Sequence, residues 1–320
     1  MPSSAGARPD RLTLVLFLLL ALTWGSSFLF IKVGLEGLSP GQVSLGRMLF
    51  GAVTLVGIML ATRRAWPRDP RIWGHLLVVG ALLCSVPFTL FAWAEQFVPS
   101  GLASVYNATT PLMALLALPL IFPAERLTIS QRIGVGVGAL GIVVVAAPWR
   151  YFAAGMTPEA LWAQLALLGA TACYGFGTVY TRRFVSSSRL DSIQIAALQM
   201  VLGAGLLILA APFQALSPMH LSWGVVAAIA ALGIFGTGLA YVWMTRVIRQ
   251  WGAARASTVT YLTPIVGVAL GMLVLGETIH WHEPVGGVIV ILGILLAQGV
   301  VRTSQKRTRG ERDERAAEVP

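Results

Sequence analysis

The feature that most constrains this chain is a series of apolar segments, each about 20 residues long, separated by short polar connections. The first runs from Leu12 to Ile31 without a charged residue. About 20 apolar residues in a helix cross the hydrocarbon core of a bilayer, which is ~30 Å thick. We therefore predict an all-α integral membrane protein.

Composition agrees with this prediction. The chain is 56% hydrophobic and 11% charged, with a mean hydropathy of +0.77, so it has too little charge to cover a soluble surface. The first segment leads into Lys32 and Glu36 rather than a small-residue cleavage site, which favours a retained helix over a signal peptide. Ten transmembrane helices are predicted, at about residues 12–31, 40–61, 72–94, 98–122, 133–149, 160–181, 192–212, 221–245, 253–276 and 284–301.

The basic residues predict the orientation. With a cytoplasmic N-terminus, 20 of the 23 Lys and Arg residues fall on the inner side, Arg150 alone falls outside, and Lys32 and Arg47 lie within spans. The positive-inside rule therefore places the N and C termini in the cytoplasm. Because the basic residues are scattered in small groups, the net charge of +10 reflects topology, and we expect no nucleic-acid partner.

A nine-residue pattern occurs twice, at 103–111 and 256–264, with Ala, Ser, Thr and Pro at the same four places and an offset of 153 residues. Beyond it, Glu125 and Gly134 correspond to Glu277 and Gly286. This duplication predicts two five-helix repeats, 12–149 and 160–301. The remaining segments are an N-terminal tail (1–11), an outer connector (150–159) and a C-terminal tail (302–320), for which disorder is predicted.

Five is an odd number, so the second repeat must enter the membrane from the opposite side to the first. Inverted repeats of this kind are typical of secondary transporters, which bind substrate near the midplane between the halves. Pro111 and Pro264 each lie ~17 Å deep and are predicted to break their helices by freeing the carbonyls of Asn107 and Thr260. The alternative is a kinked structural helix whose backbone is satisfied locally.

Several short motifs support a family resemblance. Leu22-Thr23-Trp24-Gly25-Ser26-Ser27, Gly46-Arg47 with Leu49-Phe50, and the two Ala-Ser…Thr-Pro…Glu units resemble the EamA-type transporters of the drug/metabolite transporter superfamily. The resemblance covers about residues 12–302. It implies a ten-helix protein of the bacterial inner membrane that exports amino acids or other small metabolites, with no cofactor.

Arg47 is the leading candidate for the substrate site, since a charge ~10 Å below the membrane surface normally faces the bundle or a wet cavity. It is expected to bind a substrate carboxylate, to brace the broken fourth helix or to pair with Glu95. Lys32 lies near the outer interface, where we expect it to snorkel or to pair with Glu36.

Other polar and aromatic side chains complete the predicted cavity. The second half departs from the first, because Tyr174-Gly175 replaces Trp24-Gly25 and Gln199 replaces Arg47, so the cavity should be chemically lopsided. Packing or an interfacial position is the alternative for each aromatic residue. The candidates beside Arg47 are Trp24, Trp93, Tyr106, Asn107, Thr110, Tyr174, Gln199, Tyr241, Trp243, Thr260 and Tyr261.

The sequence gives little support for catalysis. No two-histidine helix motif, phosphate loop or nucleophile elbow is visible, so we predict neither an enzyme nor a metal site. His280, His282 and Glu283 offer metal-ligand chemistry, but a loop with the interfacial Trp281 explains the same residues. Proton-driven carriers commonly keep a carboxyl group within the membrane, whereas each acidic residue of this chain maps to a loop, a tail or a helix end. We therefore expect the protein either to facilitate downhill efflux or to couple to protons through a group such as Glu95 or His75.

Together these features predict an alternating-access transporter for a small-molecule substrate in the lipid bilayer, with protons as a candidate coupling ion. The alternative is a membrane scaffold or partner subunit that does not transport but retains the fold. Glycines in the fifth and tenth helices give small faces for close packing, within one chain or between two, so both a monomer and a homodimer remain open.

Overall fold

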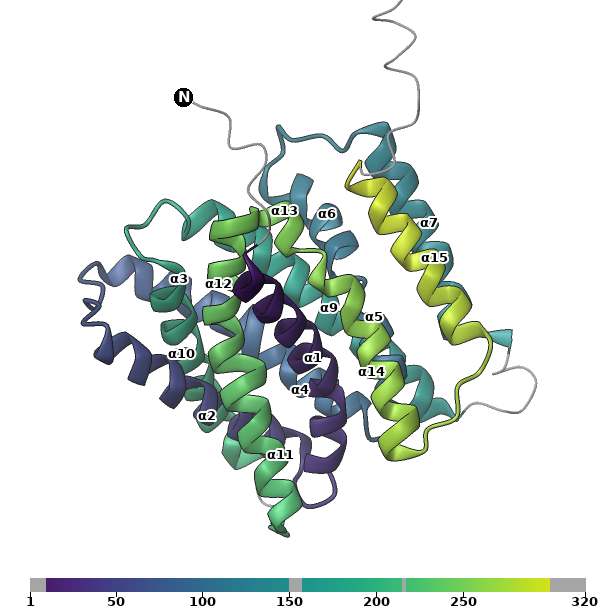
Figure 1. Cartoon of the computed structure of the whole chain (residues 1–320), viewed down its shortest axis with the longest axis horizontal. Helices are drawn as coiled ribbons and strands as arrows, with labels where there is room; N and C mark the ends of the chain where they lie inside the picture. The colour runs from purple at the N-terminus through teal and green to yellow at the C-terminus, as the bar shows by residue number, and fades with distance from the viewer. Residues whose placement is uncertain (1–9, 150–156, 215–216, 300–320) are drawn as a thin grey trace, which may run out of the picture.

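The computed structural model describes residues 10–149, 157–214 and 217–299, and these form a bundle of α-helices (Figure 1). The C-terminal tail, residues 1–9 of the predicted N-terminal tail and most of the outer connector lie outside the described residues, whereas Asp10 and Arg11 cap and begin α1. The first half contains α1 (Arg11–Gly34), α2 (Pro40–Ala61), α3 (Pro70–Gly80), η1 (Ala81–Ser85), α4 (Val86–Ala94), α5 (Ser100–Asn107), α6 (Thr110–Ile121) and α7 (Ile129–Ala146). The second contains α9 (Pro158–Phe184), α10 (Ser192–Gln214), α11 (Trp223–Gly233), η2 (Ile234–Leu239), α12 (Ala240–Trp251), α13 (Ala253–Ala256), α14 (Val259–Leu275) and α15 (His282–Ala297).

Eight helices within the described residues are long and apolar enough to cross a membrane, counting α3–η1–α4, α5–α6 and α11–η2–α12 as one rod each. The remaining two predicted spans correspond to α14 and α15, which are shorter apolar helices of 17 and 16 residues. The chain is therefore a multi-pass membrane protein.

Local sequence sets where several helices begin. Ser39 and Thr128 each accept a hydrogen bond from the backbone N–H three residues on, while Gln42 and Gln131 accept one in return from the cap residue. These reciprocal bonds satisfy N–H groups that have no partner inside the helix. The polar connections thereby fix the first turns of α2 and α7.

Two rods contain a π-helical turn at equivalent positions of the two repeats. η1 begins at Ala81 and η2 at Ile234, which is the same 153-residue offset as the duplicated motif. In each turn a hydroxyl donates to the carbonyl five residues earlier, Ser85 to Gly80 at 3.3 Å and Thr237 to Leu232 at 3.2 Å. Such turns often occur at functional sites.

The two proline helices differ. α5 ends at Asn107 and α6 begins at Thr110, so this helix is interrupted immediately before Pro111. In the second half α14 runs through Pro264, and the interruption lies earlier, at Ser257–Thr258. The expected break at Pro264 is therefore wrong in position.

Threonine hydroxyls account for this difference. Thr109 and Thr110 donate to the carbonyls of Tyr106 and Asn107, three residues back, and so tighten the turn beside Pro111. In the second half the three-residue bonds start from Thr258 and Thr260, which match Val105 and Asn107 in the repeat, so they tighten the chain at the start of α14. Thr263, next to Pro264, donates four residues back to Val259, as in a regular helix.

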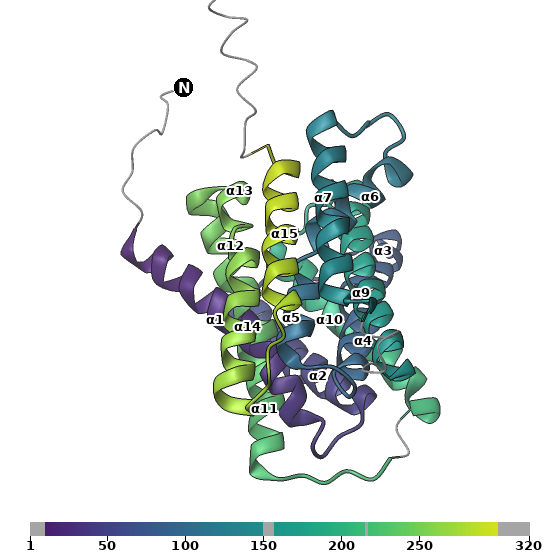
Figure 2. The ribbon, with the colours of Figure 1, turned by 90° about the vertical axis from the view of Figure 1, so that its right-hand side faces the viewer.

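α7 and α15 run side by side along one edge of the bundle (Figures 1 and 2). Their glycines make this approach possible: a Cβ on Gly134 would lie 2.5 Å from the Gly293 carbonyl oxygen, and one on Gly141 would lie 2.9 Å from the Gly286 carbonyl oxygen. The small faces predicted from the sequence thus serve packing within the chain.

Candidate functional site: a cavity between the two halves

A cavity of about 390 Å³ lies between helices of both halves. The first half contributes α1, α2, η1, α4, α5 and α6, and the second contributes α9, η2, α12 and α14. Its volume lies within the ~300–1,000 Å³ typical of small-molecule sites. Seven predicted residues line it: Trp24, Arg47, Asn107, Thr110, Tyr174, Tyr241 and Thr260.

Arg47 is held across the repeat boundary. Its Nε donates to Thr237 Oγ1 at 2.9 Å, and its Cζ lies 3.8 Å from the centre of the Phe88 ring. It therefore braces η2 in the eighth predicted span rather than the broken fourth helix. Among the described residues no acceptor pairs with its two terminal nitrogens. A guanidinium fork of this kind suits a planar carboxylate.

Five residues expected in the cavity lie outside its wall. Tyr106 is buried and donates from its hydroxyl to Gln164 Oε1 at 2.8 Å. Trp93 packs against Phe97 with ring centres 5.2 Å apart, and the Tyr261 hydroxyl donates to Gln298 Oε1 at 2.6 Å.

Gln199 is the fourth. It is buried, and its Nε2 donates to the Tyr241 hydroxyl at 2.9 Å. It therefore holds the side chain of Tyr241, which lines the cavity, without lining the cavity itself. Its counterpart in the repeat, Arg47, does line the cavity. Trp243 is the fifth, and it packs beside a separate apolar cluster that includes Phe17 and Val247.

Some lining residues were not predicted. Thr237 sits on a π-helical turn, whose position regular helical periodicity does not reveal. Phe28, Phe88, Phe91 and Met244 look in the sequence like ordinary packing residues, yet all four line the cavity. The signal that could have found Thr237 is a hydroxyl in the glycine-rich run Gly236-Thr237-Gly238 at the level of Arg47.

The two repeat motifs meet directly beside the cavity. Ser104 of α5 lies against α14, with its Oγ 3.5 Å from the carbonyl oxygen of Pro264. A Cβ on Gly267 would lie 2.5 Å from Ser104 Cβ, so glycine is required for this approach. α1 joins the same layer, since a Cβ on Gly25 would lie 3.0 Å from the Thr263 carbonyl oxygen.

One end of this α5–α14 contact is closed by Glu277. Its carboxylate accepts from the backbone N–H groups of Ser100 at 2.7 Å and Gly101 at 3.0 Å, and from Ser100 Oγ at 3.0 Å. The cap position of α5 is Pro99, which supplies no side-chain cap, so the second half caps a helix of the first. Gly276, at φ 65°, ends α14 in the left-handed conformation that turns the chain toward this contact.

Glu125, the repeat counterpart of Glu277, is used differently. It forms a two-pronged ion pair with Arg182 of α9, with distances of 3.0 and 2.8 Å. Both glutamates therefore join the two halves, Glu277 by capping α5 and Glu125 through an ion pair with the last turn of α9.

Lys32 does not snorkel. Its Nζ donates to the backbone carbonyls of Glu95 and Val98, at 3.0 Å for Val98, and so clamps the α4–α5 connection. Glu95 beside it is fully buried. The expected pairing of Arg47 with Glu95 is replaced by the Arg47–Thr237 bond.

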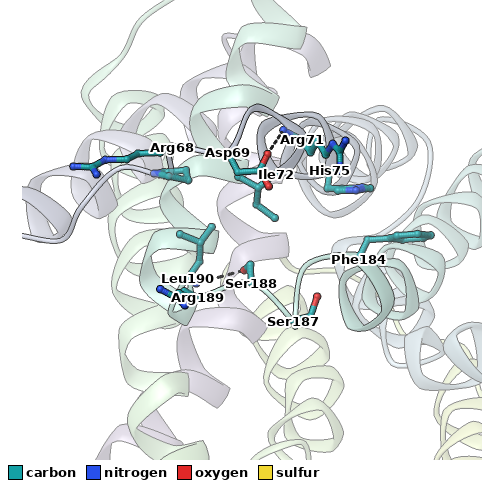
Figure 3. Close-up of a pocket in the computed structure, with 11 residues that line it drawn as sticks. Arg68, Asp69, Arg71, Ile72, His75, Phe184, Ser187, Ser188, Arg189 and Leu190 are labelled. Carbon is teal, nitrogen blue, oxygen red and sulfur yellow. Dashed lines mark hydrogen bonds between the residues drawn. The ribbon is translucent and has the colours of Figure 1, made fainter.

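A larger hollow of about 540 Å³ lies at the connections 67–72 and 184–190 (Figure 3). Figure 3 shows that its arginines point in different directions, so they do not form a common anion site. His75 at its edge is engaged with Tyr180, 2.9 Å from Nδ1 to the hydroxyl, and stacks on Phe184. The smaller cavity between the halves is the better candidate.

His280, His282 and Glu283 bring their ligand atoms within 4.8 Å of one another at the start of α15. They line a separate hollow of about 270 Å³, away from the cavity beside Arg47. Trp281 next to them is exposed and stacks on Trp149, with ring centres 6.1 Å apart. This agrees with an aromatic loop at the membrane surface.

A multi-pass helical protein with a cavity between two related halves has the architecture of a membrane transporter. The EamA-like transporter family matches the chain twice, over residues 11–147 and 161–298. The chain belongs to this family, and it is a multi-pass inner membrane protein.

Named relatives agree. The chain is 28% identical over 298 residues to a "Probable terminal-alkyne amino-acid exporter" of Streptantibioticus cattleyicolor, covering 92% of this chain and 94% of the relative. It is 28% identical to the "Uncharacterized inner membrane transporter YedA" of Escherichia coli, covering 88% and 89%. It is 27% identical to an "Uncharacterized transporter" of Archaeoglobus fulgidus, covering 88% and 97%. These names indicate a transporter rather than an enzyme.

A solved crystal structure shares the fold. It superposes with a TM-score of 0.63 and 20% sequence identity, covering 91% of this chain and 97% of the solved one.

Proposed function

We propose that the chain is an alternating-access transporter, secondary-active or facilitative, that exports small metabolites such as amino acids through the cavity beside Arg47. Ten transmembrane helices form two inverted repeats, 12–149 and 160–301, with both termini in the cytoplasm. Protons are the candidate coupling ion. The chain works as a monomer or a homodimer.

The two shorter helices fit this topology. α14 with α13 and the turn between them covers 23 residues from Ala253 to Leu275, or ~34 Å at 1.5 Å per residue. α15 covers ~24 Å, which tilt and local thinning of the bilayer accommodate at modest cost. The two family matches and the paired π-helical turns support a duplicated unit.

The observation that carries the proposal is the chemistry of the cavity. One guanidinium with unpaired terminal nitrogens faces it, together with tyrosine hydroxyls, an amide and aromatic rings. A single fixed positive charge suits a carboxylate, and the apolar wall contributed by Phe28, Phe88 and Phe91 suits a short hydrocarbon side chain. A neutral amino acid has both features, and a relative is named as an amino-acid exporter.

The test is transport by the purified full chain in proteoliposomes. The probes are labelled neutral amino acids, with L-propargylglycine as the terminal-alkyne member. Saturable exchange is expected in the wild type. It should be strongly reduced in Arg47→Met, which keeps the aliphatic stem, and retained in the control Arg132→Met, whose exposed side chain donates to Leu127. Folded protein with no exchange of any probe contradicts the proposal and favours a scaffold or partner subunit.

A further inference from the structure

Glu95, which immediately follows α4, is a carboxyl group in an unusual setting. The residue is 0% exposed, and neither carboxyl oxygen has a hydrogen-bond partner in the described part of the chain. An ionised carboxylate without donors in such a place is very costly, so the group is expected to be neutral.

We call the contact between the two halves near the start of α5 the gate. Glu277 is a second carboxyl group at this gate, and its surroundings differ from those of Glu95. Its carboxylate accepts three hydrogen bonds from Ser100 and Gly101. Two carboxyl groups thus lie at one gate, one with three hydrogen-bond donors and the other with none in the described part of the chain.

The charged groups that act on Glu95 come from three elements. They are Lys32 of α1, Arg47 of α2 and Glu277 after α14. Lys32 gives its hydrogen bonds to backbone carbonyls rather than to the Glu95 carboxyl. α9 packs along α4 with uncharged side chains, Ala163, Leu167 and Ala170.

Burial raises the pKa of the Glu95 carboxyl well above its usual range, and Glu277 adds to the rise, while Lys32 and Arg47 oppose it. The closed gate therefore binds this proton more tightly than an open gate in which water reaches the carboxyl. Lowering the pH favours the closed gate. Raising the pH through the closed-state pKa of Glu95 favours opening.

Glu95 also lies close to the substrate cavity. Phe91 lines the cavity and precedes Glu95 by four residues, about one helical turn or ~5.4 Å along α4. Ile31, another lining residue, directly precedes Lys32. Glu95 thus lies about one helical turn beyond the cavity wall.

We propose that Glu95 is the proton-binding site that couples closure of this gate to substrate export, an inference that rests on the proposed transport function. The Glu95 carboxylate takes up one proton from the outer water when the gate is open. The neutral acid is then buried as the α5–Glu277 contact closes. When the cavity opens to the cytoplasm and its water reaches Glu95, the proton leaves to that side, and outward opening with bound substrate returns the carboxylate to the outer water, which completes a cycle of one proton inward for one substrate outward.

The first test detects the proton without transport. Infrared spectra of the full chain in lipid nanodiscs are compared at neutral pH for the wild type, Glu95→Gln and the control Glu125→Gln. The wild type should show the C=O stretch of a buried protonated carboxyl group. Glu95→Gln should lose this band, and Glu125→Gln should keep it. A band that survives in Glu95→Gln, or a wild type without one, overturns the inference.

The second test measures coupling in proteoliposomes, with L-propargylglycine as the probe and a pH dye inside. In the wild type the rate of L-propargylglycine transport should change when a pH gradient is imposed. In Glu95→Gln, which mimics the neutral acid, this rate should no longer depend on the gradient. Transport in both with an unchanged response overturns the coupling role but leaves the proposed function standing. No exchange by the wild type contradicts the proposed function and the coupling role together, although the infrared result still reports the protonation of Glu95.

Discussion

Replacing Arg47 by methionine separates a substrate contact from a structural brace. The change removes the guanidinium but keeps an unbranched side chain against Phe88. It breaks the 2.9 Å bond from Nε to Thr237 and removes the two terminal nitrogens that face the cavity. These two losses have different energetic consequences.

For folding, the opposing terms are of similar size. The bond to Thr237 contributes ~1.5–3 kcal/mol, and the contact with Phe88 adds up to ~2 kcal/mol. Removing the charge recovers the ~2.5–3.5 kcal/mol that an arginine costs at the centre of a membrane helix. The stability of Arg47→Met should therefore remain within ~2.5 kcal/mol of the wild type.

Substrate binding has no such offset. Loss of a charged hydrogen bond to a carboxylate costs ~1.5–3 kcal/mol, which lowers affinity about 10- to 150-fold. The assay is probe binding or exchange in proteoliposomes, together with thermal melting in detergent. An unchanged half-saturation concentration in a stable Arg47→Met protein would refute the substrate contact. A strong loss of stability, matched by Thr237→Val, would make the residue a brace.

Further predictions concern packing, capping and the prolines. Gly134→Ala should destabilise the protein by ~1–3 kcal/mol because the added methyl group collides with α15. Gly136→Ala, whose Cβ would have no atom within 4 Å, should be neutral or stabilising by up to ~1 kcal/mol. Thermal melting compares the two variants, and equal melting temperatures would contradict the α7–α15 packing. Glu277→Ala should lower the stability of the protein by ~0.5–2 kcal/mol because it removes the cap of α5. It should also increase the labelling of a cysteine introduced at position 98 by an impermeant thiol reagent, and unchanged labelling would contradict a gate there. Pro264→Ala should stabilise α14 by up to ~3 kcal/mol because Pro264 lies inside this helix. Pro111→Ala should have a much smaller effect because Pro111 lies in the first turn of α6. The reverse order of melting temperatures would contradict the assigned break positions.

Much of the architecture is readable from the sequence because the bilayer imposes a length on each helix. Runs of about 20 apolar residues predicted an all-helical membrane protein, and the capping signals at Ser39 and Thr128 mark helix starts. The motifs around Trp24 and Arg47 led to the correct family. The number of spans and the orientation remain predictions.

The cavity wall was harder to predict because the sequence does not show which face of a helix is turned inward. Tyr106 and Asn107 are neighbours, yet Asn107 lines the cavity and Tyr106 points to Gln164. Gln199 matches Arg47 in the repeat but lies behind Tyr241. The position of the second helix break followed the threonine hydroxyls rather than Pro264.

The paired π-helical turns bear on how this chain tolerates insertion and deletion. A π-helical turn holds one residue more than the α-helix that it interrupts. Deleting one residue within Ile234–Leu239 would let this turn close with the bonding of a regular α-helix, so the helix beyond it would keep its face, whereas the same deletion in a regular α-helix would rotate everything after it by ~100°. Tyr241 would then keep its place in the cavity wall and its bond to Gln199, and the change would fall on the turn that carries Thr237, the partner of Arg47. A one-residue deletion within this turn is thus expected to disturb the Arg47 contact while sparing the fold, and a deletion in a regular part of the same rod is expected to disturb both.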